Sequence, residues 1–89
     1  MKIVVNKAFG GFSLPEEFCA QYNFDPYDDI DRTDERLVNF MENCGGHTKI
    51  DFGDLRIVAI PDTSTDWEIS QYDGFETVTY VVDGKIHHK

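Results

Sequence analysis

Residues 67–76 read Trp-Glu-Ile-Ser-Gln-Tyr-Asp-Gly-Phe-Glu, and the predicted fold is built outward from this stretch. Asp73-Gly74 is a strong hairpin signal, because a two-residue type I′ turn needs a positive φ at both central residues. With these residues in the turn, the two strands gain one apolar and one polar face. The apolar face holds Trp67, Ile69, Val78 and Tyr80, and the polar face holds Glu68, Ser70, Thr77 and Thr79. The hairpin therefore needs another part of the chain to cover its apolar face.

Three other segments have the composition of strands. Lys2–Lys7 contains a β-branched run and Leu55–Ile60 is almost continuously apolar, which is typical of strands buried on both faces. Asp83-Gly84 provides a second tight turn. We therefore expect Lys85–His88 to pair back on the hairpin as an edge strand.

Two helices are predicted between the first strand and the hairpin. Ser13 is a suitable N-cap for a helix over about Leu14–Tyr22, and Thr33 is a suitable N-cap for a second helix. Gly45 ends the second helix, and a polar loop follows it from Gly46. The side chains of the second helix that recur at the helical period, and that we expect to face the sheet, are Leu37, Phe40, Met41 and Cys44.

These elements predict one α+β domain over residues 1–89. The expected architecture is a small, mainly antiparallel sheet of four to five strands with two helices, in the order β-α-α-β-β-β with room for one more strand. A chain of 89 residues can bury one modest core. We expect the apolar face of the hairpin to pack against the helices.

The charge of the chain restricts its partners. Seventeen acidic and eight basic residues give a formal net charge of −9. This balance argues against direct binding to nucleic acid or to an anionic membrane. It favours a basic protein partner, although a net negative charge also serves solubility alone.

From the start of the chain, its apolar stretches and its cysteines we expect a cytoplasmic protein. After Met1-Lys2 the apolar run is only Ile3–Val5, too short for a secretory leader. No stretch approaches the roughly 20 apolar residues of a membrane span. Cys19 and Cys44 do not make a disulfide framework, so we expect two reduced thiols.

The sequence contains no strong catalytic or metal-binding signature. Cys44 and His47 have half the spacing of a zinc site, which His87 and His88 could complete. Adjacent residues of a strand point to opposite faces, however, so these two histidines are poorly arranged to share a metal. We expect no metal, no cofactor and no enzymatic activity.

Two features make the candidate partner-binding surface. From Asp25 to Glu35 the chain is rich in acids, but it lacks the glycine and the spacing of a calcium loop. At the hairpin tip, Tyr72 and Phe75 are aromatic residues beside acids, and they either dock a partner or pack under a helix. The candidate partner-binding residues are Asp25, Asp28, Asp29, Asp31, Asp34, Glu35, Tyr72, Asp73, Phe75 and Glu76.

Several segments resemble a family of short uncharacterised proteins of phages and mobile elements of Gram-positive bacteria. These segments are residues 1–7, 10–14, 32–34, 37–38, 60–62, 67–69 and 72–74. The resemblance carries no known active site. Small acidic proteins of such elements include inhibitors of host defence, among them anti-CRISPR proteins that block basic nucleic-acid channels. The resemblance therefore implies a role of this kind.

The leading hypothesis is therefore a non-catalytic interaction protein that binds a basic, nucleic-acid-handling host protein and inhibits a host defence. One alternative is a small-ligand binder, such as a nucleotide-signal sponge, that uses Gly10-Gly11 and nearby cations. Another is a structural or regulatory protein of a mobile element. The cations that a ligand site would need to gather are Lys2, Lys7, Arg32, Arg36 and Arg56. We expect a monomer, with a dimer as the alternative.

Overall fold

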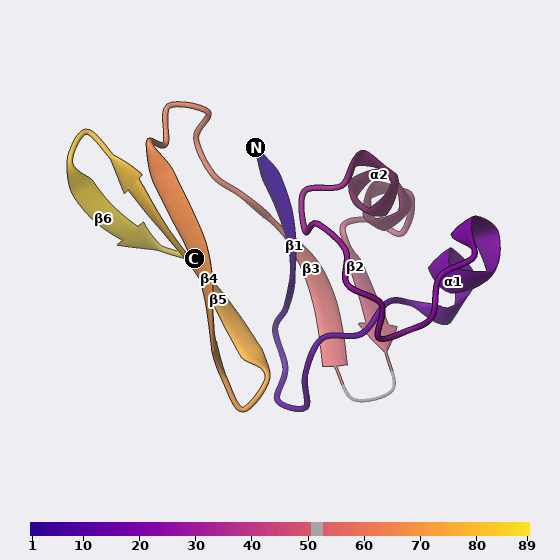
Figure 1. Ribbon diagram of the computed structural model, residues 1–89. Coiled ribbons are helices and arrows are strands. Elements are labelled where there is room, and N and C mark those ends of the chain that lie inside the picture. Colours follow the sequence, from indigo (N-terminus) through magenta and orange to yellow (C-terminus); the bar gives the residue numbers. More distant parts are fainter. Residues whose placement is uncertain (51–52) are drawn as a thin grey trace.

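The computed structural model describes residues 1–50 and 53–89 and arranges them in three layers (Figure 1). Two helices form one outer layer, a three-stranded sheet forms the middle, and a second three-stranded sheet forms the other outer layer. The elements, in chain order, are β1 (Lys2–Asn6), α1 (Glu16–Tyr22), α2 (Glu35–Asn43), β2 (His47–Ile50), β3 (Gly53–Ala59), β4 (Asp66–Tyr72), β5 (Phe75–Val82) and β6 (Lys85–His88).

The middle sheet has the strand order β1-β3-β2 and is antiparallel throughout. Its β1 strand is buried on both faces because successive side chains point to opposite layers. Val4 packs with the helices, whereas Ile3 and Val5 pack with the second sheet. The β-branched run that the sequence shows is therefore the central partition between two hydrophobic cores.

The helices cover one face of this sheet. Leu37 and Met41 of α2 and Phe18 of α1 are fully buried in a shared core with Val4 and Leu55. None of the described helices is long and apolar enough to span a membrane.

The second sheet has the order β4-β5-β6 and contains the predicted hairpin. The register sets Tyr72 against Phe75 and Ile69 against Val78, which gives the apolar and polar faces that the sequence predicted. Asp73 and Gly74 take φ values of 49° and 89°, so the turn has the positive angles that type I′ requires. Lys85–His88 pairs with β5, so the predicted edge strand is also confirmed.

The α+β class is confirmed, but the prediction of one sheet with four to five strands is wrong. The described residues form two sheets of three strands each, and β2 is a strand where a polar loop was expected. β2 has only four residues, and its side chains are alternately exposed and half-buried. So short a segment gives a weak strand pattern in the sequence, which explains why this strand was not predicted. The apolar face of the hairpin packs on the middle sheet through Ile3, Val5 and Val58, and not on the helices.

Three details of the helices also differ from prediction. The N-cap of α1 is Pro15, and Ser13 lies outside the helix. The N-cap of α2 is Asp34 instead of Thr33, and the Asp34 side chain accepts from the Arg36 amide. Cys44 is exposed because it is the C-cap, where the chain leaves the helix before Gly45.

Candidate functional site

Two of the predicted acidic residues are held by local hydrogen bonds. The Asp31 carboxylate accepts from the Thr33 amide at 2.9 Å and from its hydroxyl at 2.7 Å, and these bonds lower the pKa of Asp31. Asp34 caps α2 and pairs with Arg36, whose side-chain hydrogen bond lowers the pKa of Asp34. Both carboxylates thus have structural roles in the loop and the helix start.

Other acids on the helix side lie exposed. The loop after α1 contains Asp25, Asp28 and Asp29. The first turn of α1 contains Glu16 and Glu17. Among the described residues, none of these five carboxylates is in an ion pair, whereas Asp34, Glu42, Asp54, Asp62 and Glu76 each are. We call these five residues the acidic face. Glu35 is exposed as well, at the start of α2.

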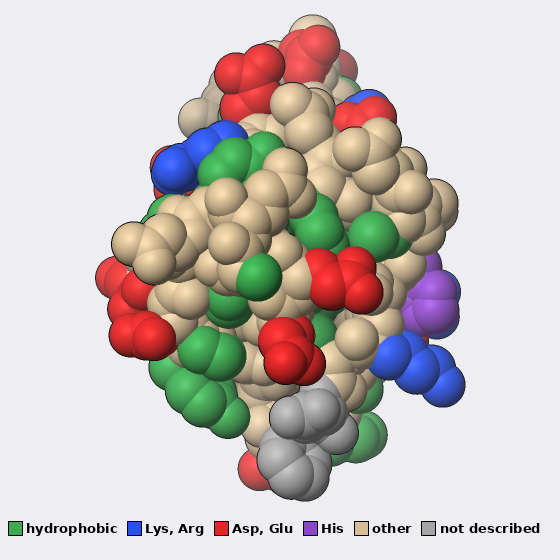
Figure 2. Space-filling view, turned by 90° about the vertical axis from the view of Figure 1, so that its right-hand side faces the viewer, with side chains coloured by type: hydrophobic (Ala, Val, Ile, Leu, Met, Phe, Trp, Pro, Cys, Tyr) green, Lys and Arg blue, Asp and Glu red, His purple; other side chains and the backbone are tan. Residues whose placement is uncertain are grey.

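Three members of the acidic face lie near Cys19 of α1. The pKa of the Cys19 thiol is raised by burial and by the negative charges of Asp25, Asp28 and Glu16, so three carboxylates act on one sulfur. Figure 2 looks onto this side of the molecule and shows acidic side chains spread over it, with cationic ones near its margins.

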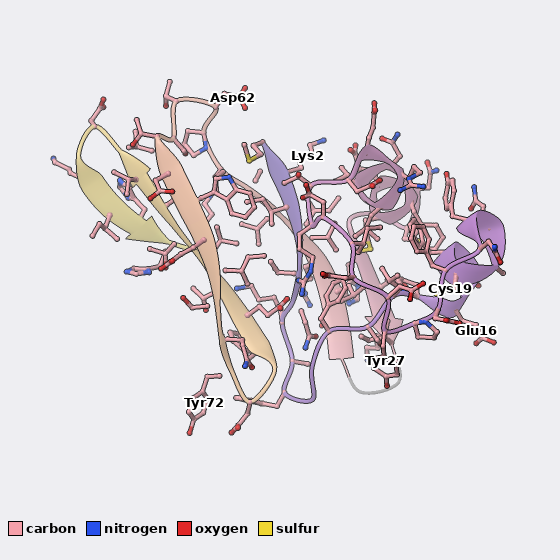
Figure 3. All side chains as sticks on the ribbon, viewed as in Figure 1. Lys2, Glu16, Cys19, Tyr27, Asp62 and Tyr72 are labelled. Carbon is pink, nitrogen blue, oxygen red and sulfur yellow. The ribbon has the colours of Figure 1, made fainter. Side chains whose placement is uncertain are left out.

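A groove of about 670 Å³ lies between α1, β2 and the loop after α1. Tyr27 stands at its rim with 81 % of its surface exposed. Figure 3 shows Tyr27 and Glu16 on the same side of the molecule and Tyr72 far from both. The lining residues are Ser13, Leu14, Pro15, Glu16, Glu17, Pro26, Tyr27, Phe40, Thr48, Lys49 and Ile50.

The hairpin tip carries a second exposed feature, which we call the aromatic tip. It consists of Tyr72, Phe75 and Phe9, with the Phe9 ring 6.5 Å from Tyr72 and 5.7 Å from Phe75 between centroids. Tyr72 is 74 % exposed and Phe9 66 % exposed, whereas Phe75 is half-buried against Phe9 and Lys7. Tyr72 therefore does not pack under a helix, and the contacts of Phe75 are with the loop after β1. Asp73 lies exposed in the turn, where its carbonyl accepts from the Gly10 amide.

Glu76 differs from the other predicted partner-binding residues because it is only 6 % exposed. Its carboxylate forms a bidentate pair with Arg32, with N–O distances of 2.7 and 2.9 Å, and accepts from the Asn6 amide at 2.7 Å. The physical reason is strand alternation, which places Glu76 on the inner face of β5 with Val78 and Tyr80. Glu76 therefore holds the layers together and is not available to a partner.

Each cation that a ligand site would need already has a partner within the structure. Lys2, Arg32, Arg36 and Arg56 pair with four different carboxylates, and Lys7 donates to the backbone carbonyls of Glu76 and Lys89. Gly10 donates its amide to the hairpin turn, and the loop packs tightly against Gly74. The Gly10-Gly11 loop is therefore engaged by the hairpin turn.

The candidate zinc residues have other neighbours. His87 stacks on Tyr80, and the His88 ring lies 3.1 Å from the Thr79 hydroxyl. Within residues 1–50 and 53–89, no three His, Cys, Asp or Glu side chains gather as a metal site. His47 instead pairs with Asp54 on β3.

Comparisons with family models, with curated proteins and with solved structures found no match to this chain. The site therefore stands on its own geometry. Sequence reasoning missed Tyr27, Phe9, Glu16 and Glu17 as surface residues. The signal for Tyr27 was an aromatic residue directly after Pro26 in an acidic loop, and the signal for Phe9 was an aromatic residue beside two glycines.

Proposed function

We propose that this protein is a non-catalytic interaction module that binds a basic surface of another protein. The observation that carries the proposal is the acidic face, whose five carboxylates have no ion-pair partner among the described residues. Unpaired, exposed charges of one sign attract a partner of the opposite sign and increase its association rate.

The aromatic tip is the second contact in this proposal. Exposed aromatic rings contribute strongly to protein interfaces when a partner desolvates them. Tyr72 and Phe9 offer such rings, and neither is covered in the described structure. The acidic face would then guide association, and the aromatic tip would add apolar contact.

The partner in this proposal is a basic, nucleic-acid-handling host protein, and the biological role is inhibition of a host defence. Two features support this choice. The net charge of −9 is complementary to a nucleic-acid channel, and the sequence resembles small proteins of phages and mobile elements.

Capture from a Gram-positive host lysate over a series of salt concentrations tests the proposal. We expect a retained protein that is lost as salt screens the charges. The test variant is Asp25→Asn with Asp28→Asn and Asp29→Asn. Its matched control makes the same change in charge on the far sheet, with Asp66→Asn, Glu68→Gln and Asp83→Asn.

The test variant should lose the partner at a lower salt concentration than both the wild type and the control. Mass spectrometry should identify the partner as a nucleic-acid-binding protein. If no protein is retained at low salt, or if the test variant and the control behave alike, the acidic face is not the binding surface.

A further inference from the structure

The groove beside α1 is lined in part by β2, an edge strand of the middle sheet. β2 is the last strand of the middle sheet, so one of its edges has no strand beside it among the described residues. The Gly46 carbonyl accepts from the Ile57 amide at 3.1 Å. Backbone groups of an antiparallel pair alternate in direction, so those of Thr48 and Ile50 point toward β3. The backbone groups of His47 and Lys49 therefore point outward, and Lys49 also lines the groove.

The walls of the groove specify what could lie beside this edge. Phe40 and Ile50 provide apolar surface, and Leu14 is almost fully buried beneath it. Glu16 and Glu17 supply two exposed carboxylates at one wall. The groove therefore suits an apolar side chain with cationic side chains close to it.

Two further residues bear on the choice of occupant. Tyr27 presents an exposed ring at the rim, and aromatic faces attract cations. Lys49 is the cation among the lining residues, but it alternates with Thr48 and Ile50 along β2. Its side chain is directed to the opposite face of the strand from theirs. The charge offered to an occupant is thus negative.

We propose that an extended, cationic segment of a partner protein binds in this groove as an additional strand on β2. Main-chain hydrogen bonds to His47 and Lys49 supply binding energy, and the alternate side chains of the segment supply specificity. This inference rests on the proposed function, because it names the class of segment through which a basic partner is recognised. A second copy of this chain is disfavoured as occupant by the net charge of −9.

The probe is a synthetic peptide of sequence Thr-Lys-Thr-Leu-Thr-Lys-Thr. As a strand on β2 it directs its lysine and leucine side chains into the groove, and its alternate threonine amides face β2. Titration followed by NMR should shift the amide signals of His47 and Lys49 and report an affinity. The same peptide with glutamate in place of lysine, or methylated on its two central threonine amides, should leave these signals unmoved.

The protein variant is Glu16→Gln with Glu17→Gln, and we expect about threefold to tenfold weaker peptide binding, as for two exposed charge pairs. Tyr27→Ala should weaken binding as well. The matched control, Glu68→Gln with Asp83→Asn, removes the same charge from the far sheet and should bind like the wild type. Equal weakening in both double variants would overturn the groove as the recognition site, because only general charge would matter.

The outcomes separate this inference from the proposed function. If the lysate partner depends on Asp25, Asp28 and Asp29 while the peptide leaves the β2 amides unshifted, the groove inference fails and the proposed function stands. If no partner is retained and no peptide binds, both fail. If the protein alone has twice its chain mass in light scattering, with β2 amides protected from exchange, a second copy fills the groove and the inference is overturned.

Discussion

Arg32 and Glu76 form a bidentate ion pair that joins the loop before α2 to the strand β5 of the far sheet. The Arg32 guanidinium also lies over the Phe12 ring, 3.5 Å from its centroid. The Arg32 carbonyl accepts a hydrogen bond from the Val4 amide of β1, and the Asn6 amide of β1 donates to the Glu76 carboxylate. One buried carboxylate of β5 thus contacts both β1 of the middle sheet and the loop that leads into α2.

Breaking this pair should destabilise the fold strongly. Glu76→Ala leaves the Arg32 guanidinium without its partner in a largely buried position, and loss of one partner of a buried pair costs about 3 kcal/mol or more. Urea unfolding would measure the loss. Glu42→Gln, which breaks the exposed pair with Lys2, is the control and should change little. Equal effects of the two variants would contradict the role given to Glu76.

Gly74 is constrained by the loop packed against it. A Cβ on Gly74 would overlap the backbone nitrogen of Gly11, and the φ of Gly74 is +89°. Gly84 occupies the equivalent place in the other turn, with φ +73° and open space around it. Gly84→Ala should therefore cost only the backbone strain, about 1–2 kcal/mol.

Gly74→Ala should cost clearly more, because the residues 10–11 must also move away from the hairpin. Thermal unfolding of the two alanine variants measures the difference. The same comparison by NMR should show shifts at Phe9 and Tyr72 only in the Gly74 variant. Equal melting temperatures would mean that the close approach of the loop contributes nothing.

Truncating a buried side chain should cost more stability in the core beneath the helices than at the rim of the core between the sheets. Phe18 is fully buried and its ring lies near those of Tyr22, Phe24 and Phe40, so Phe18→Ala should cost about 3–5 kcal/mol. Trp67 is only partly buried at the rim of the second core, so Trp67→Ala should cost less. Denaturant midpoints of both variants give the order, and a larger loss for Trp67 would reverse it.

Acid should destabilise the loop and the start of α2. The folded pKa values of Asp31 and Asp34 lie below the usual value of 3.8, because hydrogen bonds favour the charged forms. Their contribution is therefore present above about pH 4 and is lost as pH falls through the folded values. Asp31→Asn with Asp34→Asn should make stability less dependent on pH below 4. A pH series of melting temperatures checks this, and an unchanged slope would count against it.

The hairpin could be predicted from sequence because two signals indicate the same structure: the Asp73-Gly74 turn and the alternation of apolar and polar residues in the flanking strands. Asp73-Gly74 requires one turn type, and that turn leaves only one register for Ile69 and Val78. The layer that covers the hairpin could not be predicted in the same way. A run such as Ile3–Val5 is apolar on both sides, and nothing in it says whether helices or strands lie against each side.

The candidate site was only partly predictable for a related reason. An acid close to a hairpin turn is expected at the surface, yet Glu76 is buried because its position in β5 directs it inward and Arg32 lies within reach. The partners of a charge come from segments far apart in the chain, and residues 32 and 76 give no local sign of their contact. Exposed aromatics such as Tyr27 are equally hard to assign, because most aromatic side chains pack inside.

The outer face of the far sheet provides the last prediction, which concerns self-association. Val81 and Ile86 are paired across β5 and β6, and Ile86 is 67 % exposed. Two such side chains bury far less than the roughly 800 Å² per partner of a standard interface. Lys85 at the start of the edge strand β6 discourages strand pairing, and the net charge of −9 repels a second copy.

We therefore expect a monomer at physiological salt, with light scattering giving a mass near the 10.2 kDa of the chain. Ile86→Lys should leave that mass unchanged. A mass near twice the chain that persists on dilution, and that Ile86→Lys returns to the monomer value, would instead make this apolar pair the centre of a dimer interface.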